Sequence, residues 1–218
     1  MRGLKKIFAV GLVSLFSLAP LSAKATSFVY QDADYGFQTS FPDSWLMQTT
    51  DTPTTRLLVR PPVTDDMASC RVKAVNDRRA VIYPFVHRGA SVRNAVGFNF
   101  VDQKINENNN AEIVNYYPKG SMGKSDATFS QVKFDMYDDQ GNAYRMHGVV
   151  LTAIYGENRY TFSCSAKESS YGRWEKVFGS IMGSVSLKEY GHLVPTGYYR
   201  DFLSDKEVKI PSVRGGNL

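Results

Sequence analysis

The stretch that decides the fold is residues 127–166, which read ATFSQVKFDMYDDQGNAYRMHGVVLTAIYGENRYTFSCSA. Residues 127–137 alternate between two faces, residues 144–155 form a long apolar run, and residues 159–166 alternate again. Each of these segments has the pattern of a β-strand. The two connections, residues 138–142 and 156–158, are short and rich in Asp, Asn and Gly, which favour tight turns. The sequence therefore predicts three long strands in an antiparallel meander.

Shorter strand candidates surround this meander. Each is bounded by Pro, Gly, Asp or Asn, the residues that commonly end strands. We expect strands at residues 35–41, 56–60, 70–75, 81–86 and 112–117. In residues 70–75, Cys70, Val72 and Ala74 share one face. The segment 81–86 contains Pro84, which cannot donate to a neighbouring strand, so we expect it at a sheet edge.

Two amphipathic helices complete the predicted fold. Ser91 has the character of an N-cap, and an apolar stripe follows it at spacings of three and four residues. The members of that stripe are Val92, Ala95, Phe98, Val101 and Ile105. A final helix over residues 170–184 carries Trp174, Val177, Phe178 and Ile181 on one face. Because each helix has one apolar stripe, we predict an α+β fold in which amphipathic helices cover an antiparallel sheet, an αβα-type sandwich.

The first 25 residues have the three parts of a secretory signal peptide. A basic start with Arg2, Lys5 and Lys6 precedes the apolar stretch 7–21, and Ala23 and Ala25 supply the small residues of a cleavage site. The apolar stretch is too short for a stable membrane anchor. We therefore expect an exported protein, periplasmic or secreted, without a transmembrane anchor. Its mature part would consist of one domain, residues 26–187, and a C-terminal tail, residues 188–218.

The charge of the mature chain argues against binding driven by bulk charge. Residues 1–25 hold four basic residues and no acidic one, so removing them lowers the formal net charge from +5 to +1. A nucleic-acid partner or an anionic membrane recruited through net charge therefore loses its support.

Two cysteines, Cys70 and Cys164, remain in the chain after the signal peptide. An even number of cysteines in an oxidising compartment predicts a disulfide bond. Two reduced cysteines in the core are the alternative. A zinc site is not expected, because no His or second Cys lies at zinc-ligand spacing from either residue.

The sequence contains none of the common catalytic motifs, and no cofactor or metal site is predicted. The available imidazole bases are His87, His147 and His192. His147 lies within a predicted strand, where a hydrogen-bonded structural histidine is favoured over a catalytic one. The segment 138–142 has the Gly of a calcium loop without its regular ligand spacing, so we interpret it as a hairpin turn.

Two segments are candidate binding sites. His87, Arg88 and Arg93 flank the predicted helix start at Ser91 and would hold a small anion there, with a solvated loop as the alternative. In the tail, Tyr198, Tyr199, Arg200 and Phe202 combine aromatic rings with a guanidinium, a composition enriched at protein interfaces. We therefore also consider this tail segment as a docking element.

Three segments of the chain resemble the Mog1/PsbP-like superfamily. They are Tyr35-Gly36-Phe37 with Phe41-Pro42-Asp43-Ser44-Trp45, then Tyr160-Thr161-Phe162-Ser163-Cys164-Ser165-Ala166, and finally Phe178-Gly179-Ser180-Ile181-Met182-Gly183-Ser184-Val185. The resemblance covers roughly residues 28–187 and concerns positions that shape a fold. Bacterial members are commonly exported single domains, and relatives elsewhere are accessory subunits of photosystem II or bind a small GTPase. The resemblance implies a binding or assembly module and transfers no catalytic residue.

Together these observations predict a non-enzymatic exported envelope protein that binds a protein partner or a small ligand. Two alternatives stay open. One is a secreted hydrolase with an unfamiliar site, which would need a nucleophile close to a histidine nitrogen. The other is an exported effector that docks through its C-terminal tail.

Overall fold

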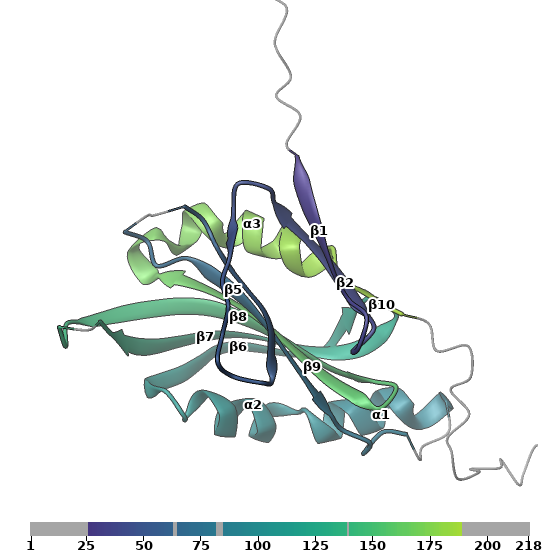
Figure 1. Cartoon of the computed structure of the whole chain (residues 1–218). Helices are drawn as coiled ribbons and strands as arrows, with labels where there is room; N and C mark the ends of the chain where they lie inside the picture. The colour runs from purple at the N-terminus through teal and green to yellow at the C-terminus, as the bar shows by residue number, and fades with distance from the viewer. Residues whose placement is uncertain (1–25, 63–64, 82–84, 139, 189–218) are drawn as a thin grey trace, which may run out of the picture.

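We analysed a computed structural model of the chain, which describes residues 26–62, 65–81, 85–138 and 140–188. Three layers make up the fold (Figure 1). A large antiparallel sheet forms the middle layer, with two helices, α1 and α2, on one side. A third helix, α3, and a small second sheet lie on the other side. The predicted α+β class and the αβα sandwich are therefore confirmed.

The large sheet has seven strands in the order β3-β4-β5-β9-β8-β7-β6, and all neighbours are antiparallel. The strands are β3 (Leu46–Met47), β4 (Thr55–Arg60), β5 (Ser69–Asn76), β9 (Asn158–Lys167), β8 (Ala143–Tyr155), β7 (Ser125–Tyr137) and β6 (Asn109–Met122). The predicted meander is β7-β8-β9, and each strand is within two residues of its expected bounds. The strand predicted at 112–117 belongs to the much longer β6.

The small sheet comprises β1 (Ser27–Asp32), β2 (Phe37–Pro42) and β10 (Ser186–Leu187), with β2 in the middle. It brings the first and last described segments of the domain together. Phe37, Thr39 and Phe41 alternate along β2 and are buried, so this strand turns one face into the core. Of the three strands, the sequence predicted only the one that corresponds to β2, at residues 35–41.

The first helical region is two helices instead of one. Helix α1 (Phe85–Ala95) begins before Ser91, which lies inside it, and α2 (Phe98–Ile105) begins after Gly97. The expected N-cap at Ser91 is therefore wrong. Gly97 has an extended backbone and interrupts the helix, in keeping with the low helix propensity of glycine. The edge strand expected at residues 81–86 is also wrong, because its last residues belong to α1; a short apolar run does not by itself distinguish strand from helix.

Helix α3 (Tyr171–Gly183) follows a short 3-10 turn, Glu168–Ser170, and confirms the predicted final helix. It buries Phe178 and Ile181 against the sheet. Trp174 is only half-buried: its ring meets Trp45 edge to face at a centroid distance of 5.7 Å, and its Nε1 donates to Asp66 at 2.9 Å. The helix is thus fixed both by apolar burial and by a polar contact at its first turns.

The main core lies between the large sheet and the layer formed by α3 and the small sheet. Its largest fully buried side chains include Tyr160, Phe37, Phe162 and Phe178, and the rings of Phe37 and Phe162 are in edge-to-face contact. Cys70 on β5 and Cys164 on β9 are directly opposite each other and form a disulfide bond. The predicted cysteine pairing is confirmed, and it links an early strand to the last long strand.

We expect denatured but unreduced protein to contain no free thiol. The bond joins residues 94 positions apart, and closing a loop of this size stabilises the fold by roughly 4–5 kcal/mol in the chain-entropy model. Reduction should therefore lower the midpoint of urea unfolding, as measured by tryptophan fluorescence. The double variant Cys70→Ala/Cys164→Ala is the control and should not respond to reductant. Two free thiols in the unreduced protein would contradict the assignment.

Candidate functional site

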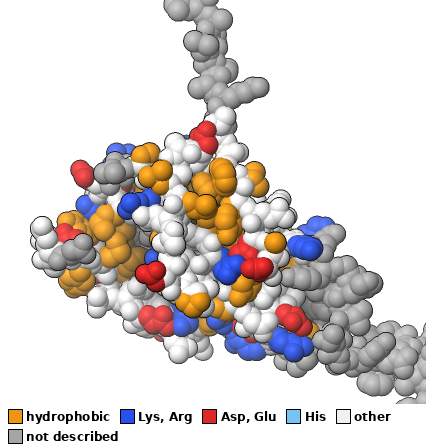
Figure 2. Space-filling view, viewed as in Figure 1, with side chains coloured by type: hydrophobic (Ala, Val, Ile, Leu, Met, Phe, Trp, Pro, Cys, Tyr) orange, Lys and Arg blue, Asp and Glu red, His pale blue; other side chains and the backbone are white. Residues whose placement is uncertain are grey.

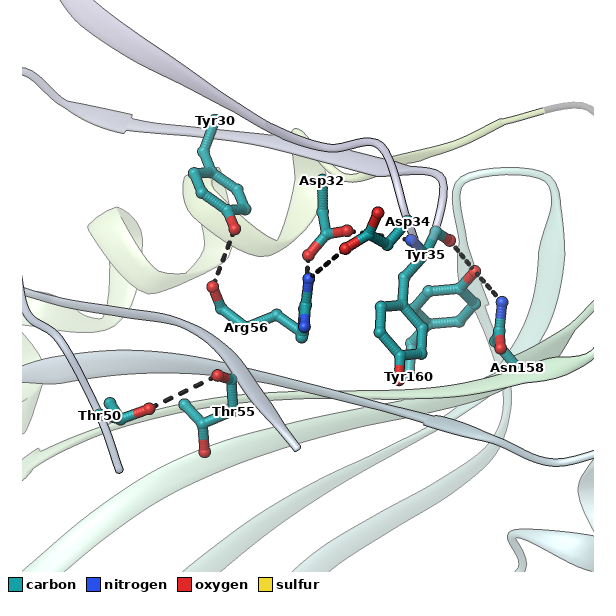
Figure 3. Close-up of polar contacts among 9 residues, drawn as sticks. All are labelled: Tyr30, Asp32, Asp34, Tyr35, Thr50, Thr55, Arg56, Asn158 and Tyr160. Carbon is teal, nitrogen blue, oxygen red and sulfur yellow. Dashed lines mark hydrogen bonds and ion pairs between the residues drawn. The ribbon is translucent and has the colours of Figure 1, made fainter. Parts of the chain in front are cut away.

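A cluster of polar and aromatic side chains joins the small sheet to β4 (Figure 3). Arg56, near the start of β4, donates through Nε to Asp32 at 2.7 Å and through a terminal nitrogen to Asp34 at 2.9 Å. Its guanidinium also lies 4.8 Å from the ring centroid of Tyr35. The Asp32 side chain is only 2% exposed, whereas that of Asp34 is 80% exposed. Arg56 therefore neutralises a buried carboxylate and reaches the surface.

Further hydrogen bonds orient this cluster. The Tyr30 hydroxyl donates to the Arg56 carbonyl at 2.9 Å, and the Tyr35 amide donates to Asp32 at 2.9 Å. The Tyr160 hydroxyl, from β9, donates to the Tyr35 carbonyl. Burial and the nearby Asp32 raise the pKa of Tyr30, which therefore stays protonated at neutral pH. The cluster thus holds the β1–β2 hairpin against the large sheet.

Next to this cluster lies a cavity of about 250 Å³ at the β4 edge. It is lined by Arg56, Leu57, Leu58, Gln48, Thr49, Thr50 and Thr55. Thr50 lies in the connection between β3 and β4, Thr55 is the first residue of β4, and the Thr50 hydroxyl donates a long hydrogen bond of 3.5 Å to the Thr55 carbonyl. The guanidinium of Arg56 is already engaged by two carboxylates. The remaining polar groups of the lining are neutral, so the cavity suits a small neutral polar ligand.

His147 on β8 has a structural position. Its ring stacks on that of Tyr171, the first residue of α3, at a centroid distance of 3.8 Å. The sequence predicts a hydrogen-bonded histidine, but the buried Nε2 atom has no hydrogen-bond partner among the described residues, and neither has the buried Tyr171 hydroxyl. Burial, with a smaller contribution from Glu175, raises the pKa of Tyr171 to about 12. In the part of the chain that the structure describes, no nucleophile is paired with this imidazole nitrogen.

The predicted anion site is only partly within the described structure. His87 and Arg88 belong to α1, but their side chains lie outside the described part. Arg93, also on α1, lies 3.5 Å from the carboxylate of Asp126. Because α1 begins at Phe85, these residues no longer flank a helix start at Ser91. Anion binding by His87, Arg88 and Arg93 stays a prediction.

The hairpin turn predicted at residues 138–142 connects β7 to β8. The Asp138 carboxylate accepts hydrogen bonds from the amides of Gln140 and Asn142, the Asn142 side chain and the Tyr144 hydroxyl. These bonds, that from the Asn142 side chain above all, lower the pKa of Asp138 to about 2. Gly141 has a φ of 82°, which the turn requires. The carboxylate is therefore occupied in shaping the hairpin.

Other candidate features are limited. The docking residues Tyr198, Tyr199, Arg200 and Phe202 and the third histidine, His192, lie outside the described residues, so docking by the tail stays a prediction. Within the described ranges, no group of three or more His, Cys, Asp or Glu side chains is placed to hold a metal ion. Nor does any helix in those ranges have the length and apolar character needed to cross a membrane.

Figure 2 shows hydrophobic side chains gathered over the region that β1 occupies in Figure 1, and charged side chains of both signs along the lower part of the same face. Phe28 and Val29 on β1 are 48% and 59% exposed. Phe28 still contacts the buried Phe41 ring at 5.3 Å, so it partly extends the core.

Sequence reasoning missed the Arg56 cluster and the cavity beside it. Asp32 and Asp34 are paired carboxylates near a turn. Nothing in their spacing from Arg56 indicates that the small sheet folds over β4. The available signal was Arg56 itself, a charged residue at the start of a strand whose Leu57 and Val59 are buried.

Replacing Arg56 with Gln is expected to lower the free energy of unfolding by about 2–4 kcal/mol, because the buried carboxylate of Asp32 loses its charged partner. The change should be measured by urea denaturation. Asp34→Asn is the matched control: this carboxylate is exposed, so its loss should cost no more than about 1 kcal/mol. Equal effects of the two substitutions would contradict the buried pair.

His147 should make stability depend on pH. Burial, and secondarily the charge of Lys133, lowers the pKa of His147 below its ordinary value of 6.5. As the pH falls, the unfolded chain takes up this proton first, so the free energy of unfolding should decrease below about pH 6.5. The His147→Gln variant should lose part of this dependence between about pH 7.5 and 5.5 in urea denaturation. A His147 titration midpoint at or above 6.5 in NMR spectra would contradict it.

Comparison with known proteins identifies the fold. No protein-family model and no curated protein sequence matches the chain. Among solved structures, the cyanobacterial PsbP protein CyanoP of Synechocystis sp. PCC 6803 is similar with a TM-score of 0.52 and 15% identity, over 79% of this chain and 98% of that one.

Two other solved structures are more distantly similar. The Ran-binding protein Mog1p of Saccharomyces cerevisiae has a TM-score of 0.45 and 8% identity, over 75% of this chain and 96% of that one. LpqN, involved in cell envelope biogenesis of Mycobacterium tuberculosis, has a TM-score of 0.47 and 8% identity, over 75% and 91%. With the likeness to CyanoP and the layer order described above, the resemblance noted in the sequence is confirmed: the chain has the Mog1/PsbP-like fold.

Proposed function

We propose that the protein is an exported, non-enzymatic binding module of the cell envelope that holds a small polar ligand in the cavity beside Arg56. The cavity of about 250 Å³ between the β3–β4 turn and the β4 edge is the observation that carries this proposal. Ligand sites are usually concave and mostly preformed, with a few well-placed polar groups. Here those groups are Gln48 and three threonines, and the apolar part is supplied by Leu57 and Leu58.

The rigid wall of the cavity supports binding. Arg56 is fixed by two carboxylates and by the Tyr35 ring, so little side-chain freedom is lost there when a ligand binds. The hydroxyl groups of Thr49, Thr50 and Thr55 donate and accept hydrogen bonds equally well. This combination favours a ligand with several hydroxyl or amide groups and no net charge.

The export part of the proposal rests on the disulfide bond and on the signal-like residues 1–25. A disulfide between two buried strands is typical of proteins that fold in an oxidising compartment. The hydrolase alternative gains no support from His147, because its Nε2 is stacked against Tyr171 and lacks a hydroxyl partner in the described part of the chain.

The test is ligand-induced stabilisation of the mature protein, residues 26–218. Monosaccharides, neutral amino acids and short neutral peptides should be screened by thermal unfolding. A ligand at a hundred times its Kd stabilises by about 2.7 kcal/mol. For a domain of this size, that raises the Tm by roughly 5–10 °C.

The double variant Thr50→Val/Thr55→Val should remove most of this Tm shift, since it deletes two hydroxyls of the lining and keeps the side-chain volume. Thr52→Val, an exposed position of the same turn, is the control and should keep the shift. The proposal fails if no compound stabilises the wild type, or if the double variant responds as the wild type does.

A further inference from the structure

The face of the large sheet opposite α3 is only partly covered by helices. On this side α1 contacts β7, and α2 contacts β6 and β7. Neither helix makes an extensive contact with β4, β5 or β9 on this side, although Phe100 of α2 reaches Arg159 of β9, and the side chains of this half are exposed or half-buried. Since Cys70, Val72 and Ala74 point into the core beneath α3, Arg71 and Lys73 must project from this open half.

Each of these two cations has a hydroxyl residue directly beside it on the neighbouring strand. The strand register pairs Arg71 with Ser163 and Lys73 with Thr161. Cross-strand partners share a face, with Cβ atoms about 4.5–5.5 Å apart. Each such set of neighbours on adjacent strands forms a row, and a third row consists of Arg60 on β4, Ser69 on β5 and Ser165 on β9. The open half thus carries a repeated pairing of cation and hydroxyl.

Within the described ranges, no carboxylate lies at ion-pair distance from either strand cation. Neither Arg71 nor Lys73 forms an ion pair with any residue that the structure describes. The nearby Lys104 and Glu107 are paired with each other at the end of α2. Burial, and secondarily the charge of Arg71, lowers the pKa of Lys73, and Glu107 offsets this only in part. Positive charge is therefore concentrated here although the mature chain is nearly neutral overall.

Uncompensated cations beside hydroxyl donors match the chemistry of phosphate. Arg and Lys form charge-assisted hydrogen bonds to phosphate oxygens, and Ser and Thr hydroxyls donate to the remaining ones. Successive rows are about 6.6–7 Å apart along a strand, so the long side chains of neighbouring rows reach one ligand that carries more than one phosphate. Helices α1 and α2 stand on the adjoining strands β6 and β7, so the open half lies below the level of the helix layer, and a free ligand enters it more easily than a flat membrane does.

We propose that the open half of the sheet binds a soluble ligand with several phosphate groups, held by Arg71 and Lys73 with Ser163 and Thr161, and extended by Arg60 and Ser69. This site adjoins the cavity beside Arg56, because Leu58 of the cavity lining is the cross-strand partner of Arg71, but it takes a different class of ligand. Binding at this site depends on the positive charge concentrated at Arg71 and Lys73 and does not require a high net charge of the whole chain.

The proposal is tested by calorimetric titration of the mature protein with inorganic tripolyphosphate, and with sulfate at equal ionic strength. The double variant Arg71→Gln/Lys73→Gln should weaken tripolyphosphate binding at least tenfold, since it removes two charge-assisted contacts. Lys119→Gln/Lys176→Gln is the control: it makes the same change in net charge at two exposed positions, on β6 and on α3, and should stay within twofold of wild type. Ser163→Ala should weaken binding by a smaller factor.

Three results would overturn the proposal: no binding of tripolyphosphate to the wild type, equal weakening in both double variants, or equal affinity for sulfate and tripolyphosphate. Vesicles of phosphatidylglycerol in phosphatidylcholine form a further arm. Binding to these vesicles without binding to tripolyphosphate would assign the face to a membrane and would also overturn it. Thermal unfolding of each variant verifies that it is folded, and the response of the Thr50→Val/Thr55→Val variant separates this site from the cavity.

Discussion

The pairing of β5 with β9 is the constraint on which the rest of the structure depends. The meander β7-β8-β9 forms from local turns, but β9 must also pair with β5, from the first half of the chain. That contact closes a loop of 94 residues, which is costly in chain entropy, and the disulfide between Cys70 and Cys164 reduces this cost once the bond has formed. β9 alternates strictly between buried and half-buried residues, so its register decides which side chains enter the core.

The same register explains why the two faces of the sheet differ. Tyr160, Phe162 and Cys164 lie beneath α3 and the small sheet, where apolar burial is the main stabilising contribution. The intervening Thr161 and Ser163 point to the other face, and their partners on β5 are Lys73 and Arg71. A helix packed over this second face would bury these cations without partners, which is unfavourable. The polar rows and the position of α1 and α2 at β6 and β7 are therefore consistent with each other.

Local features were predictable from the sequence, and features that depend on distant contacts were not. The turns at residues 138–142 and 156–158 carry their own signals, so the meander and α3 could be predicted closely. The break at Gly97 was missed because the apolar stripe continues across it from Val92 to Ile105, although glycine was visible. β1 belongs to a local hairpin with β2 that was missed, and β3 is only two residues long, whereas β10 pairs with β2 from the far end of the domain, a contact that no local pattern indicates. The Arg56 cluster was missed for the same reason, whereas Arg71 and Lys73 could have been found from the alternation already recognised in Cys70, Val72 and Ala74.

The Arg56 cluster beside the small sheet and the open half of the large sheet differ in what they contribute to the stability of the domain. Arg56 holds the small sheet in place by neutralising Asp32, and the cavity exists because the β3–β4 turn stands beside that fixed side chain. Its lining is therefore preorganised by contacts that also stabilise the fold. Arg71 and Lys73 in the open half do not stabilise the fold in this way. They form no ion pair within the described structure, while their neighbours on β5 form the core. Charged residues without a structural partner are available to bind a ligand. The strand β5, held between β4 and β9, is rigid and keeps Arg71 and Lys73 at a fixed spacing.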